Sequence, residues 1–404
     1  MSASRPVRCT ILSPYVDQHG GAELSLMHAL RLGRQHGIEW ALAVPRDGEI
    51  PMLARELGLD VTHYGESRTR DPIGYVRSIV AIRRLIRSHQ SEMLLSWDAF
   101  PHYRGFAAAI AAGVPSVWFQ KGGVAENPAT RRHARLPARA ILANSTYTAD
   151  RQFALQESVN KRRPIYVVPS AVDLVEFGSD RVPCRDACRR ELGLPLDQPI
   201  VALVGRLQAW KGFHVLVEAA KPILAEHPGT RFLLIGGEHW SEPDYPEQLR
   251  ERVCELGITN AVDFAGRVPH DAVARYVQSA DVLVHASVGE PFGIVVIEAM
   301  AMGKAVVAAS QGGPTMVVRD GVDGLLADPT NPNALANSIL RILRDKSLAE
   351  RLGQAAAERA TLFNTDAFGT RLAWALRSIR DRQHGPGVVL DDSLAADQHG
   401  RPRP

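Results

Sequence analysis

Cysteine is scarce in this sequence. Four cysteines occur in 404 residues, and Cys9, Cys184, Cys188 and Cys254 form no CxxC pair and no Cys/His ladder with zinc-finger spacing. This scarcity excludes a disulfide framework and a zinc-finger module, and it fits a reducing compartment.

Long apolar runs are missing as well. No stretch reaches the roughly 18 uninterrupted apolar residues that a membrane-spanning helix needs. The first residues, MSASRPVRCTIL, lack the apolar core of a signal peptide. We therefore expect a soluble, cytoplasmic protein.

The chain as a whole has little excess charge, but its parts differ. The formal net charge is +3, whereas residues 1–170 hold 22 Lys and Arg against 14 Asp and Glu, and residues 171–404 hold 25 against 30. The basic part is an ordinary solvated surface, or it faces a phosphorylated substrate, an anionic membrane or nucleic acid. Nucleic acid is the least favoured, because no RNP, zinc-finger or helix-turn-helix signature accompanies the charge. A peripheral contact with the inner membrane surface stays open, with Arg83, Arg84 and Arg87 of one predicted helix as candidates.

The sequence does contain a regular alternation of short apolar runs with helical periodicity, which is typical of parallel sheets with crossover helices. A chain of this length exceeds what one hydrophobic core supports. A proline-punctuated stretch breaks the pattern, so we predict a first α/β domain at 1–170, a linker at 171–198 and a second α/β domain at 199–365. Residues 382–404 are rich in Gly, Pro and polar side chains and are expected to form a disordered tail.

A first motif follows the strand predicted at Ile200–Val204. It runs from Gly205 to Gly212 and contains Arg206 and Lys211. Ligands of open α/β sheets bind at the carboxyl ends of the strands. The glycines would let backbone N–H groups approach a diphosphate, and the two cations would neutralise its charge. A solvated charge is the simpler interpretation of either cation alone, but the position after a strand favours an anion site.

A second motif, EPFGIVVIE, runs from Glu290 to Glu298 after the strand predicted at Val282–His285. Pro291 is expected in the first turn of a helix, where the N–H groups of the next residues are free to bind an anion. Glu298 lies in the apolar stretch IVVIEAMAM, where a buried carboxylate needs a hydrogen-bonding partner. One carboxylate is expected to meet the sugar of a ligand and the other its ribose. The simpler alternatives are a favourable charge at a helix start and a pairing with a lysine elsewhere.

A third motif, Gly20-Gly21, follows the first predicted strand. Taken alone, it is a turn that uses glycine for its conformation. Placed opposite a phosphate site, it would let the start of a helix in the first domain approach the ligand.

In order along the chain, the segments GGAELSLMHAL, ANSTYTAD, VVPSAVDLVEF, GRLQAWKG, LLIGG, VDFAGRVP, SADVLVHAS, EPFGIVVIEAMAMGKAVVAAS and DGVDGLLADP resemble the retaining glycosyltransferases of family four, the group 1 glycosyl transferases. The likeness runs from Gly20 to about Leu362. It implies the GT-B fold, an α/β fold in which two doubly wound, Rossmann-like domains face a cleft. It also implies a C-terminal helix at 366–381 that returns to the first domain.

The resemblance assigns a role to each motif residue. Arg206 and Lys211 would hold the diphosphate, Glu290 would contact the sugar hydroxyls, and Glu298 would hold the ribose. The resemblance implies further contacts with the donor, largely through backbone groups. These contacts would be made by Gly20, Gly21, Phe292, Gly293 and Ile294, and near the base by Arg267 and Val268.

Two positions depart from the family pattern. Lys121 stands where the family usually has a histidine beside the reacting carbon, and Met316 stands where a glutamate is usual. We expect Lys121 to be catalytic and to contact the phosphate side of the donor or a carboxylate-bearing sugar. The alternatives are a lysine that points into solvent, and a shifted register in which His102 or His133 fills the role.

The implied reaction is the transfer of a sugar from a UDP-, GDP- or ADP-sugar to a hydroxyl of a glycan, lipid-linked or small-molecule acceptor. No cofactor and no metal are expected, because the sequence has no DxD triplet. Arg206, Lys211 and helix N-termini would instead stabilise the leaving diphosphate. Two other functions stay open: a sugar-nucleotide epimerase of the same fold, and a sugar-nucleotide-binding protein that has lost activity.

Overall fold

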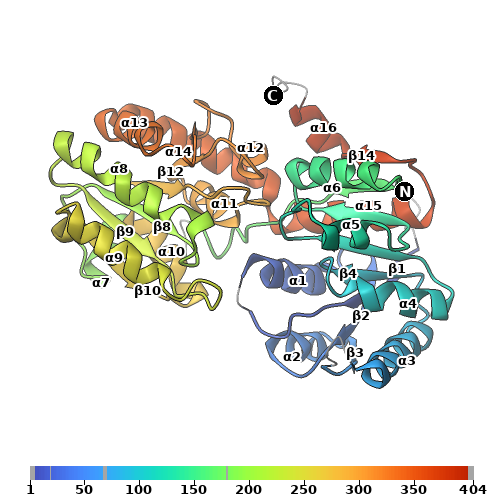
Figure 1. Cartoon of the computed structure of the whole chain (residues 1–404). Helices are drawn as coiled ribbons and strands as arrows, with labels where there is room; N and C mark the ends of the chain where they lie inside the picture. The colour runs from blue at the N-terminus through green and yellow to red at the C-terminus, as the bar shows by residue number, and fades with distance from the viewer. Residues whose placement is uncertain (1–4, 19, 67–70, 179–180, 399–404) are drawn as a thin grey trace. The chain divides into compact units, whose positions relative to one another are not determined.

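The computed structural model describes residues 5–18, 20–66, 71–178 and 181–398. The chain forms two α/β units: unit 1 comprises Met1–Ala171 and Thr365–Pro404, and unit 2 comprises Val172–Asn364 (Figure 1). Each unit is built on one parallel sheet with helices on its faces. This confirms the predicted fold class.

The sheet of unit 1 has the strand order β14-β7-β6-β5-β4-β1-β2-β3. Every residue of β4, β5 and β6 is buried, as expected for central strands of a parallel sheet covered on both faces. The strands are β1 (Val7–Leu12), β2 (Ile38–Val44), β3 (Asp60–His63), β4 (Met93–Trp97), β5 (Ser116–Gln120), β6 (Ala140–Ala143), β7 (Pro164–Val167) and β14 (Gly387–Val389).

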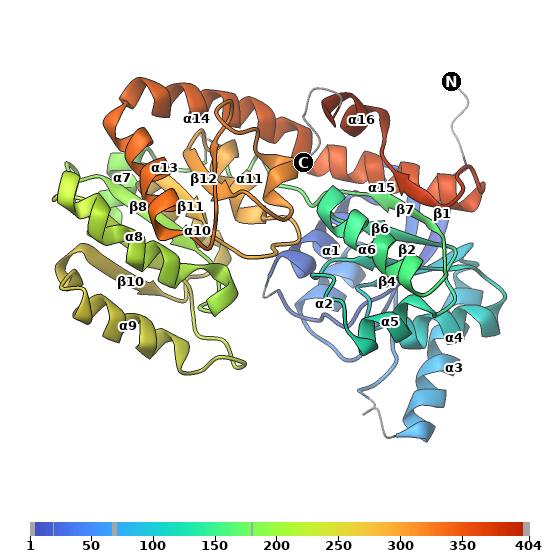
Figure 2. The same ribbon diagram turned by 45° about the horizontal axis from the view of Figure 1, so that its top comes forward.

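The helices of unit 1 cover both faces of this sheet. Residues of α1, α2 and α15 share one apolar core with the strands, and residues of α3 and α4 share another. In Figure 2, α15 lies beside α1, and α3 lies beside α4. The helices are α1 (Gly21–Leu32), α2 (Glu49–Glu56), α3 (Pro72–Ser88), α4 (His102–Ala112), α5 (Pro128–Ala134), α6 (Thr146–Ser158), α15 (Thr365–Arg380) and α16 (Asp392–Gln398).

The sheet of unit 2 has the order β10-β9-β8-β11-β12-β13. Its first strand in sequence lies at the centre, and the chain winds outward on one side and then on the other, as in dinucleotide-binding domains. The strands are β8 (Ile200–Val204), β9 (Arg231–Ile235), β10 (Val262–Gly266), β11 (Val282–His285), β12 (Ala305–Ala309) and β13 (Leu325–Ala327).

The helices of unit 2 connect these strands. Residues of α8, α9 and α13 share one apolar core with β8, β9 and β11. The helices are α7 (Arg185–Glu191), α8 (Phe213–Glu226), α9 (Tyr245–Glu255), α10 (His270–Ser279), α11 (Ile294–Ala301), α12 (Pro314–Val317), α13 (Pro332–Arg344) and α14 (Lys346–Ala360), with short 3₁₀ turns at Ala209–Lys211, Thr259–Ala261 and Thr361–Phe363.

The segment predicted as a linker, 171–198, is for the most part an ordered piece of unit 2. It contains α7, and the side chain of Arg189 on this helix is fully buried. The Arg189 guanidinium donates to Asp281 at 2.7 Å and to the carbonyl of Ser279 at 2.8 Å. A buried arginine held by a carboxylate and several carbonyls anchors the segment, which proline spacing alone does not reveal.

The prediction of a disordered tail at 382–404 is wrong for the residues described, 382–398. Strand β14 extends the unit 1 sheet by pairing with β7. The side chain of Leu394 is 3% exposed, and Arg371 of α15 donates to Asp391 at 2.9 Å. A short apolar strand and one buried ion pair therefore order a segment whose composition suggested otherwise. Residues 399–404 lie outside the described part.

Helix α15 occupies the segment in which a returning helix was expected, 366–381. It belongs to unit 1, where Phe368, Leu372 and Leu376 are buried in the core shared with α1. Among the described residues, no helix combines the length and the apolar character that crossing a bilayer requires.

Candidate functional site

The two motifs of unit 2 meet at one edge of its sheet. The order of the strands reverses between β8 and β11, which lie side by side. Parallel sheets bind ligands at the carboxyl ends of the strands at such a reversal. The motif that begins at Gly205 follows β8, and the motif that begins at Glu290 follows β11, so both start at this point.

Glycine is required where the loops approach one another. Gly212 has φ +77°, and a Cβ atom on it would lie 2.1 Å from the carbonyl oxygen of Ala286. The N–H of Val288 donates to the carbonyl of Trp210 at 2.8 Å. A side chain at Gly212 would therefore force apart the loops that follow β8 and β11.

Lys211 and Glu290 form a contact between these loops. The Lys211 Nζ donates to Oε2 of Glu290 at 2.6 Å, and Nε2 of His285 lies 3.3 Å from the same oxygen. Burial alone would raise the pKa of the Glu290 carboxyl, but the Lys211 ammonium and the His285 ring hold this pKa well below its usual range. Glu290 is therefore a stable anion in a buried setting, and the cation expected to hold a diphosphate is already paired with it.

The helix after Glu290 begins later than predicted. Pro291 and Phe292 lie in a loop, and α11 starts at Ile294 with Gly293 as its N-cap at φ +95°. Pro291 is thus not in the first turn, because the left-handed conformation of Gly293 redirects the chain before the helix. As a glycine, the N-cap residue Gly293 has no side chain with which to cap α11. The Phe292 ring is 2% exposed and packs against Phe363, so Phe292 can offer a ligand only its backbone.

Gly313 supports the loop that carries Glu290. The N–H of Gly313 donates to the carbonyl of Glu290 at 2.7 Å. A Cβ atom on Gly313 would lie 2.3 Å from the carbonyl oxygen of Pro291. Met316, where a glutamate was expected, follows in α12 with a side chain only 2% exposed. It therefore belongs to the apolar interior of unit 2.

Glu298 is held in the opposite protonation state from Glu290. It lies in the second turn of α11, its side chain is 4% exposed, and its carboxyl forms no hydrogen bond with a residue that the structure describes. Burial, together with the charge of Glu176, raises the pKa of Glu298 to about 8. A neutral carboxyl can donate a hydrogen bond, which suits a ligand hydroxyl.

The loop that follows β9 is bordered by the segments that carry Arg206, Arg267 and Val268. Arg206 is exposed, and its guanidinium lies 3.5 Å from Nε2 of His239. A Cβ atom on Gly237 would lie 2.8 Å from Cβ of Arg267, so the loops after β9 and β10 touch. Val268 is half-buried next to Arg267. All of these groups belong to the carboxyl edge of one sheet.

In unit 1, Gly20 and Gly21 open α1. Gly20 is the N-cap, with an extended backbone at φ −173°, and no side chain caps the helix. Any residue can adopt this extended conformation. The only remaining reason for a glycine at position 20 is therefore that it lets a ligand approach the backbone closely. His19, in the same motif, lies outside the described residues.

Lys121 is buried, which contradicts the alternative of a solvent-exposed lysine. It follows β5, is 6% exposed and donates from Nζ to the hydroxyl of Ser25 on α1 at 2.6 Å. The ammonium lies 3.8 Å from the centroid of the Phe119 ring and 5.2 Å from that of Trp97. Burial lowers the pKa of Lys121 to about 7, and the nearby Asp98 opposes this shift.

His102 and His133 are core residues. His102 is fully buried between the hydroxyl of Ser96 and the carbonyl of Pro137, and His133 is 8% exposed. Burial lowers the pKa of His102 to about 3 and that of His133 to about 4. Both are neutral packing groups, which gives no support to the shifted register.

The structure adds two residues that the sequence analysis missed, His285 and Asp98. His285 ends β11 and reaches Glu290. Asp98 follows β4 with an unusual φ of +100°, and its Oδ2 accepts from the hydroxyl of Tyr15 at 2.9 Å. Burial raises the pKa of Asp98. The signal available in the sequence was a polar residue at the end of a buried strand for His285, and directly after one for Asp98. This signal does not identify a functional residue unless the contacts are known.

Comparison with known proteins shows similarity to glycosyltransferases. The model of the family glycosyl transferases group 1 matches residues 185–359. A D-inositol 3-phosphate glycosyltransferase of Acidothermus cellulolyticus is 38% identical over 229 residues, which are 56% of this chain and 50% of that protein. The chain thus matches about half the length of this curated relative.

Two solved structures share the fold of the whole chain. HepE of Anabaena in complex with UDP and glucose has a TM-score of 0.78 at 24% identity, covering 92% of this chain and 100% of that one. A glycosyltransferase from Rickettsia africae has a TM-score of 0.79 at 18% identity, covering 93% and 99%. The chain therefore has the GT-B fold, and its residues 185–359 are similar to the group 1 glycosyl transferases.

Proposed function

We propose that this protein is a retaining glycosyltransferase that binds a nucleoside diphosphate sugar at the carboxyl edge of the unit 2 sheet. The buried contact among Lys211, Glu290 and His285 carries the proposal, because it joins the loops after β8 and β11 at the point where the sheet order reverses. The name of the Acidothermus relative and the UDP and glucose bound to HepE support a sugar nucleotide as the donor.

The proposed residue roles follow from charge and burial. Arg206 is exposed and available to a phosphate, and Lys211 would share its ammonium between Glu290 and the diphosphate. The N-terminus of α11, whose N-cap residue is Gly293, would add N–H donors. Glu290, as an anion, would accept from the sugar hydroxyls, and Glu298, as a neutral carboxyl, would hold the ribose.

The proposed reaction exchanges one bond for another at the anomeric carbon. The bond from this carbon to the diphosphate oxygen breaks, and the acceptor oxygen attacks from the same face. The acceptor proton passes to the oxygen of the leaving phosphate. Positive charge gathers on the sugar in the transition state, as in glycoside hydrolysis, while Arg206, Lys211 and the α11 dipole stabilise the negative charge on the diphosphate. In this proposal, no cofactor or metal takes part.

A donor panel tests the proposal. We expect release of UDP, GDP or ADP from one nucleotide sugar only when an acceptor such as D-inositol 3-phosphate is present, measured by coupled nucleotide detection. A change of the sugar without acceptor would indicate an epimerase. Donor binding, measured by thermal shift, without either reaction across a broad acceptor set would indicate a binding protein.

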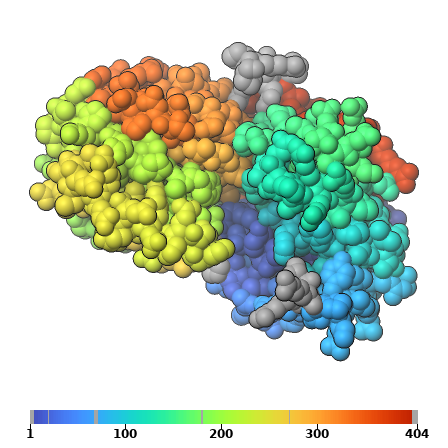
Figure 3. Space-filling view, in the orientation of Figure 1, coloured from blue at the N-terminus to red at the C-terminus, as the bar shows by residue number. Residues whose placement is uncertain are grey.

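We also propose a peripheral membrane contact for unit 1. The structure reduces the three candidate arginines of this contact to two. Arg83 is tied to the carbonyl of Ala111 at 2.9 Å, whereas Arg84 and Arg87 are exposed on α3. Ile73 and Val76 on the same helix are 65% and 57% exposed. Helix α3 forms the light-blue surface at the lower right of Figure 3. Exposed apolar side chains beside arginines suit the interface of an anionic bilayer.

We expect the double substitution Arg84→Glu and Arg87→Glu to abolish sedimentation with phosphatidylserine vesicles at low salt. The parent should bind reversibly and lose binding as salt rises, since exposed charges are screened over about 8 Å at physiological ionic strength. The charge-matched control changes Lys346 and Arg351 of α14 to glutamate. Equal binding by both double variants would rule out α3 as the contact.

A further inference from the structure

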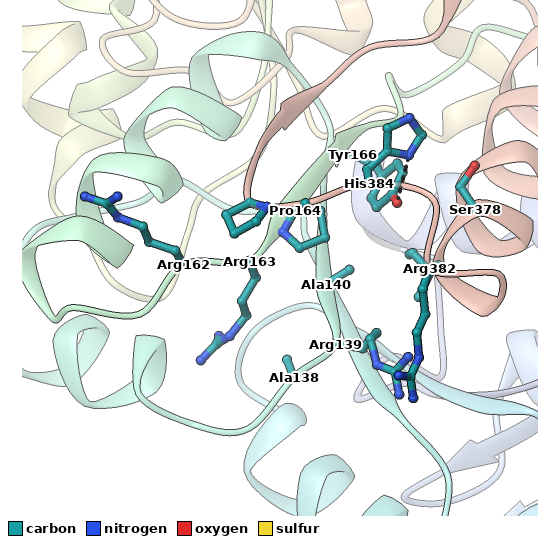
Figure 4. Close-up of a pocket in the computed structure, with 13 residues that line it drawn as sticks. Ala138, Arg139, Ala140, Arg162, Arg163, Pro164, Tyr166, Ser378, Arg382 and His384 are labelled. Atoms are coloured by element: carbon teal, nitrogen blue, oxygen red, sulfur yellow. Dashed lines mark hydrogen bonds between the residues drawn. The ribbon is translucent and has the colours of Figure 1, made fainter.

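Unit 1 contains a second cluster of cations, on the edge of its sheet opposite to Asp98 and Lys121. A cavity of about 470 Å³ opens at the amino ends of β6 and β7 and at the turn after α15. The side chains that line it include four arginines and a histidine, and the described residues contribute no carboxylate to the lining (Figure 4). The charged lining residues are Arg139, Arg162, Arg163, Arg382 and His384.

Two of these arginines are already engaged. Arg162 pairs with Glu157 at 3.4 Å. Arg163 donates to the carbonyls of Ala134 and Leu136, at 3.0 and 2.7 Å. In Figure 4 both side chains point away from the guanidinium groups of Arg139 and Arg382.

Arg139 and Arg382 form the part of the cluster that pairs with no acidic side chain of the described residues. Their guanidinium groups lie together in Figure 4, and no described residue accepts a hydrogen bond from either. Burial, and then the charge of Arg382, lower the pKa of Arg139. Like charges held side by side repel, and an anion between two guanidinium forks would turn this repulsion into attraction.

The backbone at Arg382 provides a second, independent sign. Arg382 has φ +55° and sits at the left-handed position that ends α15, where the N–H of Gln383 donates to the carbonyl of Ser378 at 3.0 Å. Glycine is the favoured residue at such a helix end. A strained arginine at this place is accounted for if its side chain is needed beside Arg139.

The turn that carries Arg382 is held firmly against the sheet. The hydroxyl of Tyr166 in β7 and Nδ1 of His384 lie 3.2 Å apart, and the two rings pack with centroids 5.6 Å apart. The backbone of Arg382 is therefore fixed by contacts on both sides of its position in the turn. A fixed backbone reduces the conformational freedom that the Arg382 side chain loses when a ligand binds.

We propose that Arg139 and Arg382 form a binding site for a phosphate group, carried by a soluble phosphorylated molecule or by a lipid headgroup. The site is separate from the donor site in unit 2 and does not depend on transferase activity. A bound phosphate would tie the turn after α15 to the start of β6.

The test uses inorganic phosphate as the probe, with the full chain at constant ionic strength. We expect phosphate to raise the unfolding temperature of the parent and to slow amide hydrogen exchange at 381–386. Arg139→Ala and Arg382→Gly should each weaken phosphate binding by about tenfold or more. Glycine keeps the left-handed turn, so Arg382→Gly separates loss of the ligand site from loss of the fold.

Arg162→Ala is the matched control, because Arg162 lines the same cavity but is paired with Glu157. It should respond to phosphate as the parent does. Binding of phosphatidic acid vesicles, with the same dependence on Arg139 and Arg382, would identify the lipid headgroup as the source, and binding of free phosphate alone would identify a soluble ligand. An absent phosphate effect in the parent, or an equal effect in all four proteins, would overturn the proposal.

Discussion

Glu290→Gln should lower the rate of sugar transfer by about 10²- to 10³-fold and leave the affinity for the free nucleoside diphosphate within a few-fold of the parent. The Glu290 carboxylate balances the Lys211 ammonium at 2.6 Å and keeps its negative charge although it is buried. Glutamine has nearly the same shape but no charge, so it would remove the group proposed to orient the sugar. Steady-state kinetics and calorimetric titration of UDP and GDP measure the two effects.

Glu298→Gln is the matched control, because Glu298 is also buried but mostly neutral below its pKa of about 8. It should weaken nucleotide binding more than turnover at saturating donor. Because the pKa of Glu298 is raised on folding, the parent should lose stability relative to this variant as the pH rises from about 4.5 to about 8. Equal effects of both substitutions on nucleotide binding would contradict the division of roles.

Lys121→Met should change the pH dependence of folding by several kcal/mol. The pKa of Lys121 falls from 10.5 to about 7 on folding, so the unfolded chain binds the proton more tightly between these values. The penalty for burying the ammonium is then fully present below about pH 7 and vanishes above about pH 10.5. At 1.36 kcal/mol per pKa unit, it amounts to at most about 5 kcal/mol.

Urea unfolding of the parent and of Lys121→Met across this pH range measures the effect. Relative to the parent, the variant should gain stability at neutral pH. As the pH rises, the free energy of unfolding of the parent should increase relative to that of the variant. Lys304 is also buried, with a pKa lowered to about 8, but it titrates in both proteins and cancels from the difference. A difference independent of pH would mean that the Lys121 ammonium is solvated, contrary to its 6% exposure.

The parts of the fold with strong local patterns could be predicted from the sequence. Strands β8 and β11 have the predicted bounds, because buried parallel strands are continuous apolar runs. Because these two strands were located correctly, the motifs that begin at Gly205 and Glu290 follow β8 and β11 as predicted. The predicted start of α11 is wrong. Gly293 adopts a φ of +95° where it lies beside Pro314 of α12, and the local sequence does not reveal this neighbour.

The elements that escaped prediction depend on partners distant in sequence. Strand β14 exists because β7 pairs with it, and α7 is anchored by Asp281, which lies 92 residues beyond Arg189. The burial of Lys121 depends on Ser25 of α1 and on the rings of Phe119 and Trp97, which surround its ammonium. Periodicity within one segment carries no information about such contacts, whereas a polar residue after a strand is visible in the sequence.

The division of the chain has a consequence for the order of synthesis. Unit 2 is a continuous segment, and its ends are joined where the N–H of Val172 donates to the carbonyl of Phe363 at 2.9 Å. Unit 1 needs Phe368, Leu372 and Leu376 of α15 to complete its core. A ribosome therefore finishes unit 2 while unit 1 still lacks a helix, so we expect the second unit to mature first, the reverse of the usual order from the N-terminus. A nascent chain stalled after unit 2 should keep β1 and its neighbours accessible to protease.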